Sequence, residues 1–196
     1  MAERKVFAIM DLEWTSWEGA HQRQWSGPGE EMEIVQIGAL KIKDDETLTE
    51  MDSLDVLVTP SINPGLSDYF IQLTGITQER LDGDGIGFPD ALKALQAFLG
   101  PGTGPGTKAV YSMGTDYRII ERNCDLNGVE FPFDEAIFVN ARELLKPIVG
   151  EDVATSDSSQ LPAAMGFPPP GAAHHGLGDC RCIAETLRIL RRQGKF

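Results

Sequence analysis

Five side chains that can bind a cation or move a proton stand at widely separated positions of the chain. They are Asp11, Glu13, Asp116, His174 and Asp179. Neighbouring residues of a strand project to opposite faces, so Asp11 and Glu13 reach one site while Leu12 between them returns to the core. Two ionised carboxylates at this spacing need a cation nearby, and Mg²⁺ or Mn²⁺ suits such hard oxygen ligands. The pattern predicts a divalent metal site.

Asp116 and Asp179 each admit a second interpretation as helix caps. Both precede segments with helical spacing, and a carboxylate at a helix start accepts hydrogen bonds from backbone N–H groups. The pair at positions 11 and 13, taken alone, also fits a solvated strand end. Neither role requires the acids to meet, whereas a metal site does, so their convergence on one edge of a sheet decides between the interpretations.

His174 lies in a loop rich in glycine and proline, which is too polar and irregular to supply a buried core histidine. Four residues separate it from Asp179, so a loop histidine and an aspartate in the first turn of a helix can face one cavity. An imidazole that titrates near neutral pH can take a proton from an attacking water. His175 suits this role equally well, and the residues alone leave both open. Acids and imidazole together indicate metal-assisted hydrolysis of a phosphodiester.

The elements that position these residues form an α/β fold, with a mixed central sheet of about five strands and helices on both faces. The expected strands cover 5–10, 34–42, 54–58, 109–113 and 136–139, and the expected helices cover 88–99, 116–124, 141–148 and 179–192. The second and third strands form a meander, and loops with short helices follow from Pro60. A strand-helix-strand connection makes the strand at 109–113 parallel to the first. Their carboxyl ends then open on one edge, where such sheets bind ligands.

Length and composition fit a single domain over residues 1–196. The sequence at 100–107, GPGTGPGT, therefore reads as a surface connection rather than a linker between domains. The apolar run before Asp11 is too short for a signal peptide or a membrane span. A cytoplasmic protein without a membrane partner is expected, and three cysteines predict neither a disulfide framework nor a zinc site.

The net charge of −13 argues against a protein that grips long nucleic acid through many phosphate contacts. Residues 1–100 carry 7 basic and 18 acidic side chains, whereas residues 101–196 carry 10 and 12. Contacts with a polyanion are therefore expected mainly from the second half. The acidic runs at 30–33 and 44–46 also fit a solvated face that serves solubility.

At this point the chain resembles the DEDDh-type 3′–5′ exonucleases of the DnaQ-like superfamily. DLEWT corresponds to the first motif, GTDYRII to the second and HHGLGDCRCIA to the third. Within that superfamily, EIVQIGALKI, LSDYFIQLTGITQERLD and VNARELL are similar to the ERI-1-like and KapD-like exoribonucleases. The resemblance covers nearly the whole chain. Its specificity comes from the order of the first and third motifs with LTGIT between them.

The resemblance implies an RNase H-like fold and a mechanism with two divalent cations, Mg²⁺ or Mn²⁺. Asp11 would bridge both ions, Glu13 and Asp179 would hold the ion that activates the water, and Asp116 would support the second ion. The spacing to Asp179 that the family keeps makes His174 the general base and leaves the neighbouring histidine on a variable position.

The implied reaction is hydrolysis of single-stranded RNA from its 3′ end, which releases nucleoside 5′-monophosphates. The implied substrate-binding residues are Leu12, Trp14, Thr15, Leu73, Thr74 and His174. Trp17, Tyr69 and Phe70 are further candidates for stacking on bases, although an aromatic residue is more often part of the core. The insert Trp14–Glu33 is expected to border the substrate site.

Two alternatives stay open: a DNA-directed 3′–5′ exonuclease of the proofreading type, and a catalytically silent module that binds nucleic acid. The chain also departs from the family at Gly178, where relatives usually have Asp, and at Cys182, where they often have Asn. These departures bear on the local support of the loop that carries His174.

Overall fold

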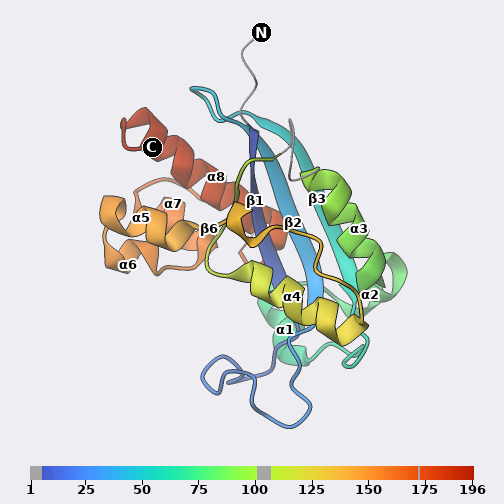
Figure 1. The fold of residues 1–196 in the computed structure, drawn as a ribbon. Helices are drawn as coiled ribbons and strands as arrows, with labels where there is room; N and C mark the ends of the chain where they lie inside the picture. The colour runs from blue at the N-terminus through green and yellow to red at the C-terminus, as the bar shows by residue number, and fades with distance from the viewer. Residues whose placement is uncertain (1–5, 101–106, 172) are drawn as a thin grey trace.

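The computed structural model describes residues 6–100, 107–171 and 173–196, in which six strands form one mixed sheet in the order β4-β3-β2-β1-β5-β6 (Figure 1). The strands are β1 (Val6–Trp14), β2 (Ile34–Lys43), β3 (Glu50–Thr59), β4 (Ile86–Gly87), β5 (Val110–Ser112) and β6 (Phe138–Asn140). β1, β2 and β3 are antiparallel neighbours, and β5 pairs parallel with β1 and with β6. The predicted meander and the predicted parallel pairing are both confirmed.

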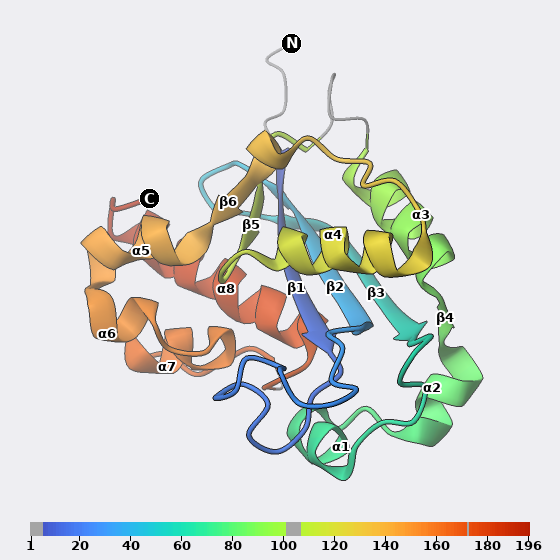
Figure 2. The same cartoon turned by 60° about the horizontal axis from the view of Figure 1, so that its bottom comes forward.

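Helices cover both faces of the sheet (Figures 1 and 2). The helices are α1 (Asp68–Thr74), α2 (Gln78–Asp84), α3 (Phe88–Leu99), α4 (Asp116–Asn127), α5 (Ala141–Val149), α6 (Glu151–Ala154), α7 (Leu161–Ala164) and α8 (Gly176–Arg192), with 3₁₀ turns η1 (Glu135–Ile137) and η2 (Ser158–Gln160). One core joins the sheet to α8 and α5, and a second core joins it to α3 and α4. This is the expected α/β architecture.

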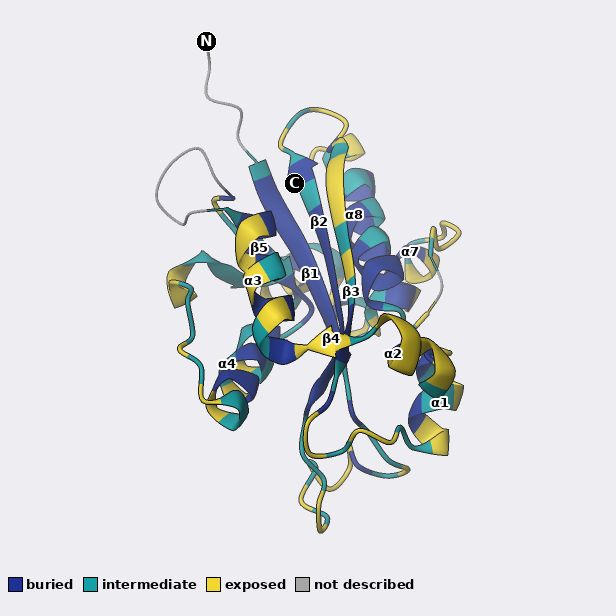
Figure 3. Ribbon diagram, turned by 90° about the vertical axis from the view of Figure 1, so that its right-hand side faces the viewer, coloured by how far each residue is buried: buried dark blue, intermediate teal, exposed yellow. Residues whose placement is uncertain are grey.

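β1 runs through the middle of the sheet and is buried along most of its length (Figure 3). Phe7 and Ile9 belong to the core under α8, whereas Ala8, Met10 and Leu12 belong to the core under α3 and α4. This alternation follows from the period of two in a strand. The acids at positions 11 and 13 therefore continue the row that faces α8.

Three details differ from the sequence-based expectation. The sheet gains a sixth strand because β4, with only two residues, pairs with the end of β3, and so short a strand leaves no periodic signal. β3 begins at Glu50 rather than at residue 54. The sequence pattern missed this first half of the strand because it is largely exposed and has no apolar alternation (Figure 3). The expected strand at 136–139 is a 3₁₀ turn followed by β6, since the Asp134 carboxylate accepts a hydrogen bond from the Ala136 N–H at 2.9 Å.

Lys5, in the first predicted strand, and positions 101–106 of the predicted connection lie outside the described residues. Within the part of the chain that the structure describes, no helix has both the length and the apolar character needed to cross a membrane. The single domain over the whole chain stays a prediction.

The start of α8 lies directly on the backbone of β2. A Cβ on Gly38 would stand 2.2 Å from the carbonyl carbon of Gly176, the first residue of α8. We expect Gly38→Ala to lower the free energy of unfolding by about 1–3 kcal/mol, because backbone cannot move aside as a flexible side chain does. Urea unfolding measures this. Gly65→Ala is the control, since a Cβ there meets nothing within 4 Å, and equal stability of the two variants would contradict the prediction.

Candidate active site

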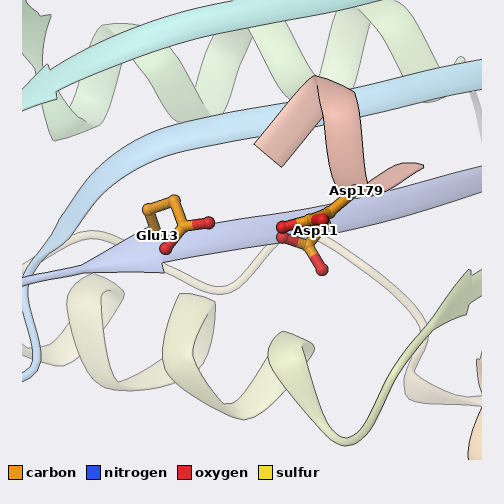
Figure 4. Close-up of side chains that lie close together, drawn as sticks. All are labelled: Asp11, Glu13 and Asp179. Atoms are coloured by element: carbon orange, nitrogen blue, oxygen red, sulfur yellow. The ribbon is translucent and has the colours of Figure 1, made fainter. Parts of the chain in front are cut away.

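Three carboxylates meet where the end of β1 lies beside the start of α8 (Figure 4). Asp11 and Glu13 come from β1 and Asp179 from the first turns of α8, and one oxygen of each lies within 4.8 Å of the others. α8 begins at Gly176, three residues earlier than predicted, and His175 occupies its cap position. The cap position itself thus belongs to His175, while the Asp179 carboxylate accepts backbone hydrogen bonds from His175 and His174, as the capping interpretation expected of it.

Asp116 reaches the same place from the other face of the sheet. It is the first residue of α4, shortly after β5, and its carboxylate accepts a backbone hydrogen bond from Leu12, which partly offsets the rise that burial causes in its pKa. It is not one of the three acids whose oxygens cluster. All four acids line one cavity of about 160 Å³. The cap position of α4 belongs to Thr115, whose side chain makes no capping hydrogen bond.

The four carboxyl groups repel one another in a poorly solvated place. Burial, followed by the charges of Asp116, Glu13 and Asp179, raises the pKa of Asp11 well above its usual range. Burial also raises the pKa of Glu13 to about 8 and the pKa values of Asp116 and Asp179 to about 7. The nearby charge of Arg142 works in the opposite direction on Asp116. A cation among these groups would remove the repulsion.

The donor set fits a divalent cation. Every candidate ligand atom is a carboxylate oxygen, which is the ligand that Mg²⁺ and Mn²⁺ prefer. Asp179 Oδ1 is buried and has no hydrogen-bond partner among the described residues. An unpaired buried acceptor is costly unless something binds it, and a cation among the three oxygens would supply that partner.

The two adjacent histidines face different surroundings. His174 lines the cavity of the acids and the larger cavity beside it, and its backbone has a left-handed φ of 52°. His175 caps α8, with Nδ1 3.4 Å from the Gly178 N–H, and its Nε2 lies 3.2 Å from Gln36 Nε2 and 3.8 Å from Asp55 Oδ2. Of the two, only His174 lines these cavities.

A second cavity of about 460 Å³ continues from the acids and has aromatic walls. It is lined by Leu12, Glu13, Trp14, Ser16, His21, Trp25, Tyr69, Leu73, Asp157 and His174. The insert between β1 and β2 lies beside α1, where the Ser67 hydroxyl donates to the Ser16 carbonyl (Figure 2). Trp25 donates its Nε1–H to the Thr15 carbonyl at 2.9 Å and packs on Trp14 with ring centroids 5.9 Å apart. The insert thus borders this cavity.

The predicted substrate-binding residues divide into two groups. Leu12, Trp14, Leu73 and His174 line the aromatic cavity. Thr15 and Thr74 do not: both are buried, and their hydroxyls bond to backbone carbonyls of Glu31 and Phe70. Their side chains hold the insert and α1 in place rather than facing the cavity.

Several residues that line the two cavities were not predicted as site residues. Arg142 belongs to the segment VNARELL, whereas Ser16, His21, Trp25, Asp157 and Ser158 belong to no quoted motif. The insert and the segment 151–164 show no periodic pattern, so the sequence gives no direction for their side chains. Among the three aromatic candidates, Tyr69 lines the cavity, Trp17 does not, and Phe70 is a core residue with 1% exposure.

The departures from the family pattern lie close to the loop before α8. A Cβ on Gly171 would stand 2.7 Å from the Gly178 Cα, so loop and helix touch there through backbone. Cys182 is buried in α8.

The acidic run at 30–33 was also expected to fit a solvated face. This interpretation is wrong for Glu33, which is 2% exposed and accepts hydrogen bonds from the backbone N–H groups of residues 61–63.

The fold and this site define the class of protein. A family model for exonucleases of the RNase T type matches residues 8–187, and the chain belongs to this DEDDh exonuclease family. The expected superfamily and α/β fold are therefore confirmed. The chain is similar to 3′-5′ exoribonuclease 1 of Homo sapiens, with 28% identity over 189 residues that make up 93% of this chain and 52% of the relative. It thus spans about half the length of the curated relatives it matches.

Solved structures show the same likeness. The nuclease domain of 3′hExo, a DEDDh family member bound to rAMP, matches with a TM-score of 0.82 and 25% identity, over 98% of this chain and 94% of that chain. Exonuclease I of E. coli in complex with a dA16 oligonucleotide matches with a TM-score of 0.68 and 13% identity, over 96% of this chain and 41% of that chain. The second likeness is one of fold alone.

Proposed function

We propose that this chain is a metal-dependent exonuclease that hydrolyses single-stranded RNA from its 3′ end to nucleoside 5′-monophosphates. The observation that carries the proposal is the group of three carboxylate oxygens within 4.8 Å, next to an aromatic cavity that holds His174. The similarity to 3′-5′ exoribonuclease 1 and to a nuclease domain bound to rAMP supports RNA as the substrate class.

The residues of the site have different roles in the proposed reaction. Asp11, Glu13 and Asp179 would hold one divalent cation, and Asp11 with Asp116 would hold a second. When bound, the two ions stabilise the negative charge on the attacking and leaving oxygens. A ring nitrogen of His174 takes the proton of the attacking water.

The aromatic cavity accounts for substrate binding by so acidic a protein. Its walls offer flat apolar surfaces to a base, and its polar end, with Glu13 and His174, adjoins the acids. Stacking of the terminal base then replaces the many phosphate contacts that a protein with a net charge of −13 does not offer.

We expect Trp25→Ala to raise the KM for RNA by roughly ten- to one-hundred-fold with little change in kcat, because stacking on an aromatic is worth about 1–3 kcal/mol per base. Steady-state kinetics on a short oligomer measures this. Trp17→Ala is the matched control from the same insert, since Trp17 does not line the cavity. Equal KM values for the two variants would remove Trp25 from the substrate site.

The proposal is tested with 5′-labelled RNA and DNA oligomers of the same sequence, incubated with the purified protein and Mg²⁺ or Mn²⁺. Stepwise shortening confined to RNA is expected, and Asp11→Ala is expected to stop it. A ladder that persists with Asp11→Ala comes from another nuclease. Oligomer binding without shortening would favour the silent module.

A DNA-directed exonuclease is the second candidate. The carboxylate site does not read the sugar, and only contacts with the 2′-hydroxyl distinguish the two substrates. Exonuclease I, bound to a DNA oligomer, shares this fold. Equal or faster shortening of DNA in the same assay would favour this candidate over the RNA enzyme.

A further inference from the structure

Arg142 makes no direct ion pair among the described residues, although its charge opposes the rise in the pKa of Asp116 across the cavity of the acids. Four arginines of the described segments are partly buried, and three of them form ion pairs: Arg181 with Glu50 at 3.1 Å, Arg188 with Glu185 at 3.5 Å and Arg191 with Asp44 at 2.9 Å. Arg142 has no ion pair among the described residues, although it lines the cavity that contains the four acids. A half-buried guanidinium without a direct salt-bridge partner favours an anion that it can contact, and the phosphate of the proposed substrate is such an anion.

The guanidinium of Arg142 is held rigidly by backbone. Its Nε donates to the Met113 carbonyl at 3.0 Å, and its Nη1 donates to the carbonyls of Ala154 and Ser156 at 3.1 and 3.3 Å. These acceptors are neutral, so the full charge remains. Nη2 donates to no described residue and is not a fully buried unpaired atom. The two N–H groups of Nη2, on a fixed and charged guanidinium, are thus left for a ligand.

We propose that Arg142 binds a non-bridging oxygen of the phosphate that is hydrolysed, through Nη2. The inference rests on the proposed exonuclease function and adds a phosphate-binding residue to it. Arginine suits phosphate because its planar fork makes directed, charge-assisted hydrogen bonds. Because three carbonyls fix the guanidinium beforehand, little side-chain freedom is lost when the phosphate arrives.

Arg142 also has a positioning role that an experiment must separate from phosphate binding. It ties the end of β5 to the segment 154–156, and the next residues, Asp157 and Ser158, line the cavity of the acids. Ser158 Oγ lies 3.5 Å from Asp11 Oδ1. Loss of this tie alone would disturb every ligand of the site, whereas loss of a phosphate contact would disturb only ligands that carry a phosphate.

The discriminating measurement compares AMP with adenosine in the presence of Mg²⁺, by calorimetry, without any turnover. We expect the wild-type protein to bind AMP more tightly than adenosine. Arg142→Gln is expected to weaken AMP about ten- to one-hundred-fold, the range of a hydrogen bond to a charged group, and to leave adenosine unchanged. Arg142→Lys keeps the charge, so its affinity for AMP should lie between those of the wild type and Arg142→Gln. This variant replaces Arg142→Gln in the test if the glutamine variant does not fold. Arg181→Gln is the matched control outside the cavity and should behave like the wild type.

Three results would overturn the inference: no preference of the wild type for AMP, unchanged AMP affinity in Arg142→Gln, or an equal loss for AMP and adenosine. The RNA-shortening assay keeps this test separate from the proposed function. If the wild type shortens RNA while Arg142→Gln binds AMP normally, only the inference fails. If the wild type shortens no oligomer but binds AMP through Arg142, the proposed function fails and the phosphate site stands.

Discussion

Asp11→Asn is expected to lower the exonuclease rate by about three orders of magnitude or more, because the ions that this carboxylate would hold in the proposed mechanism contribute several kcal/mol of transition-state stabilisation. The same substitution should make the metal-free protein more stable than the metal-free wild type at pH 8. Asp11 is 9% exposed and is repelled by Asp116, Glu13 and Asp179. An amide of the same shape removes that repulsion, so activity and metal-free stability are expected to change in opposite directions.

The stability of the metal-free fold is expected to fall as the pH rises. An aspartate or glutamate in an unfolded chain has a pKa near 4, whereas in the fold the pKa of Glu13 is about 8 and those of Asp116 and Asp179 are about 7. The folded state therefore holds protons that the unfolded state has released. Their contribution to stability is fully present below about pH 4 and is lost as the pH rises through about 7 to 8.

Thermal unfolding with EDTA and with Mg²⁺ or Mn²⁺, at pH 5 and pH 8, measures these effects. The cation should raise the midpoint of the wild type more at pH 8, because ligands must lose protons to bind it. Asp52→Asn, on the exposed part of β3, is the control and should leave activity and metal response unchanged. A metal-free Asp11→Asn protein that is less stable than the wild type at pH 8 would refute the electrostatic account.

His174→Ala is expected to reduce turnover by about 10²- to 10⁴-fold, the range for loss of a general base, while stabilisation by Mg²⁺ persists. The residues that would hold the cation are carboxylates, and His174 is not one of them. His175→Asn is the matched neighbour: asparagine can keep the cap of α8 by accepting from the Gly178 N–H, so turnover should stay near that of the wild type.

The rate of single-turnover RNA cleavage, with the cation saturating, compares the two variants. If His175→Asn loses turnover with its metal response intact while His174→Ala remains active, the two assignments must be exchanged. If both variants lose metal-induced stabilisation, the loop before α8 has collapsed and the rates report folding rather than proton transfer.

The sequence by itself was sufficient to predict the structure wherever a repeat over a few residues decides the geometry. Alternation along β1 placed Asp11 and Glu13 on one face and Leu12 on the other, as the two cores show. Helical spacing gave α3 its full range, 88–99. The connection between β1 and β5 gave their parallel pairing. Such features depend on neighbours within a few residues, or on the fixed handedness of a crossover.

Long-range packing decided the rest. Gln36 and Asp55 draw His175 toward β2 and β3, and thereby leave His174 to the cavities. Carbonyls from three separate positions fix Arg142, and the insert folds back to bring Trp25 against Trp14. No helical or strand period encodes these contacts, because each joins residues of different elements or loops, from Trp14 and Trp25 in one insert to Gln36 and His175, which are 139 positions apart. The sequence therefore predicted which acids meet and on which face of β1, and the family resemblance chose His174 over His175. The tertiary structure gave the physical basis for that choice and decided which aromatic and basic side chains line the two cavities.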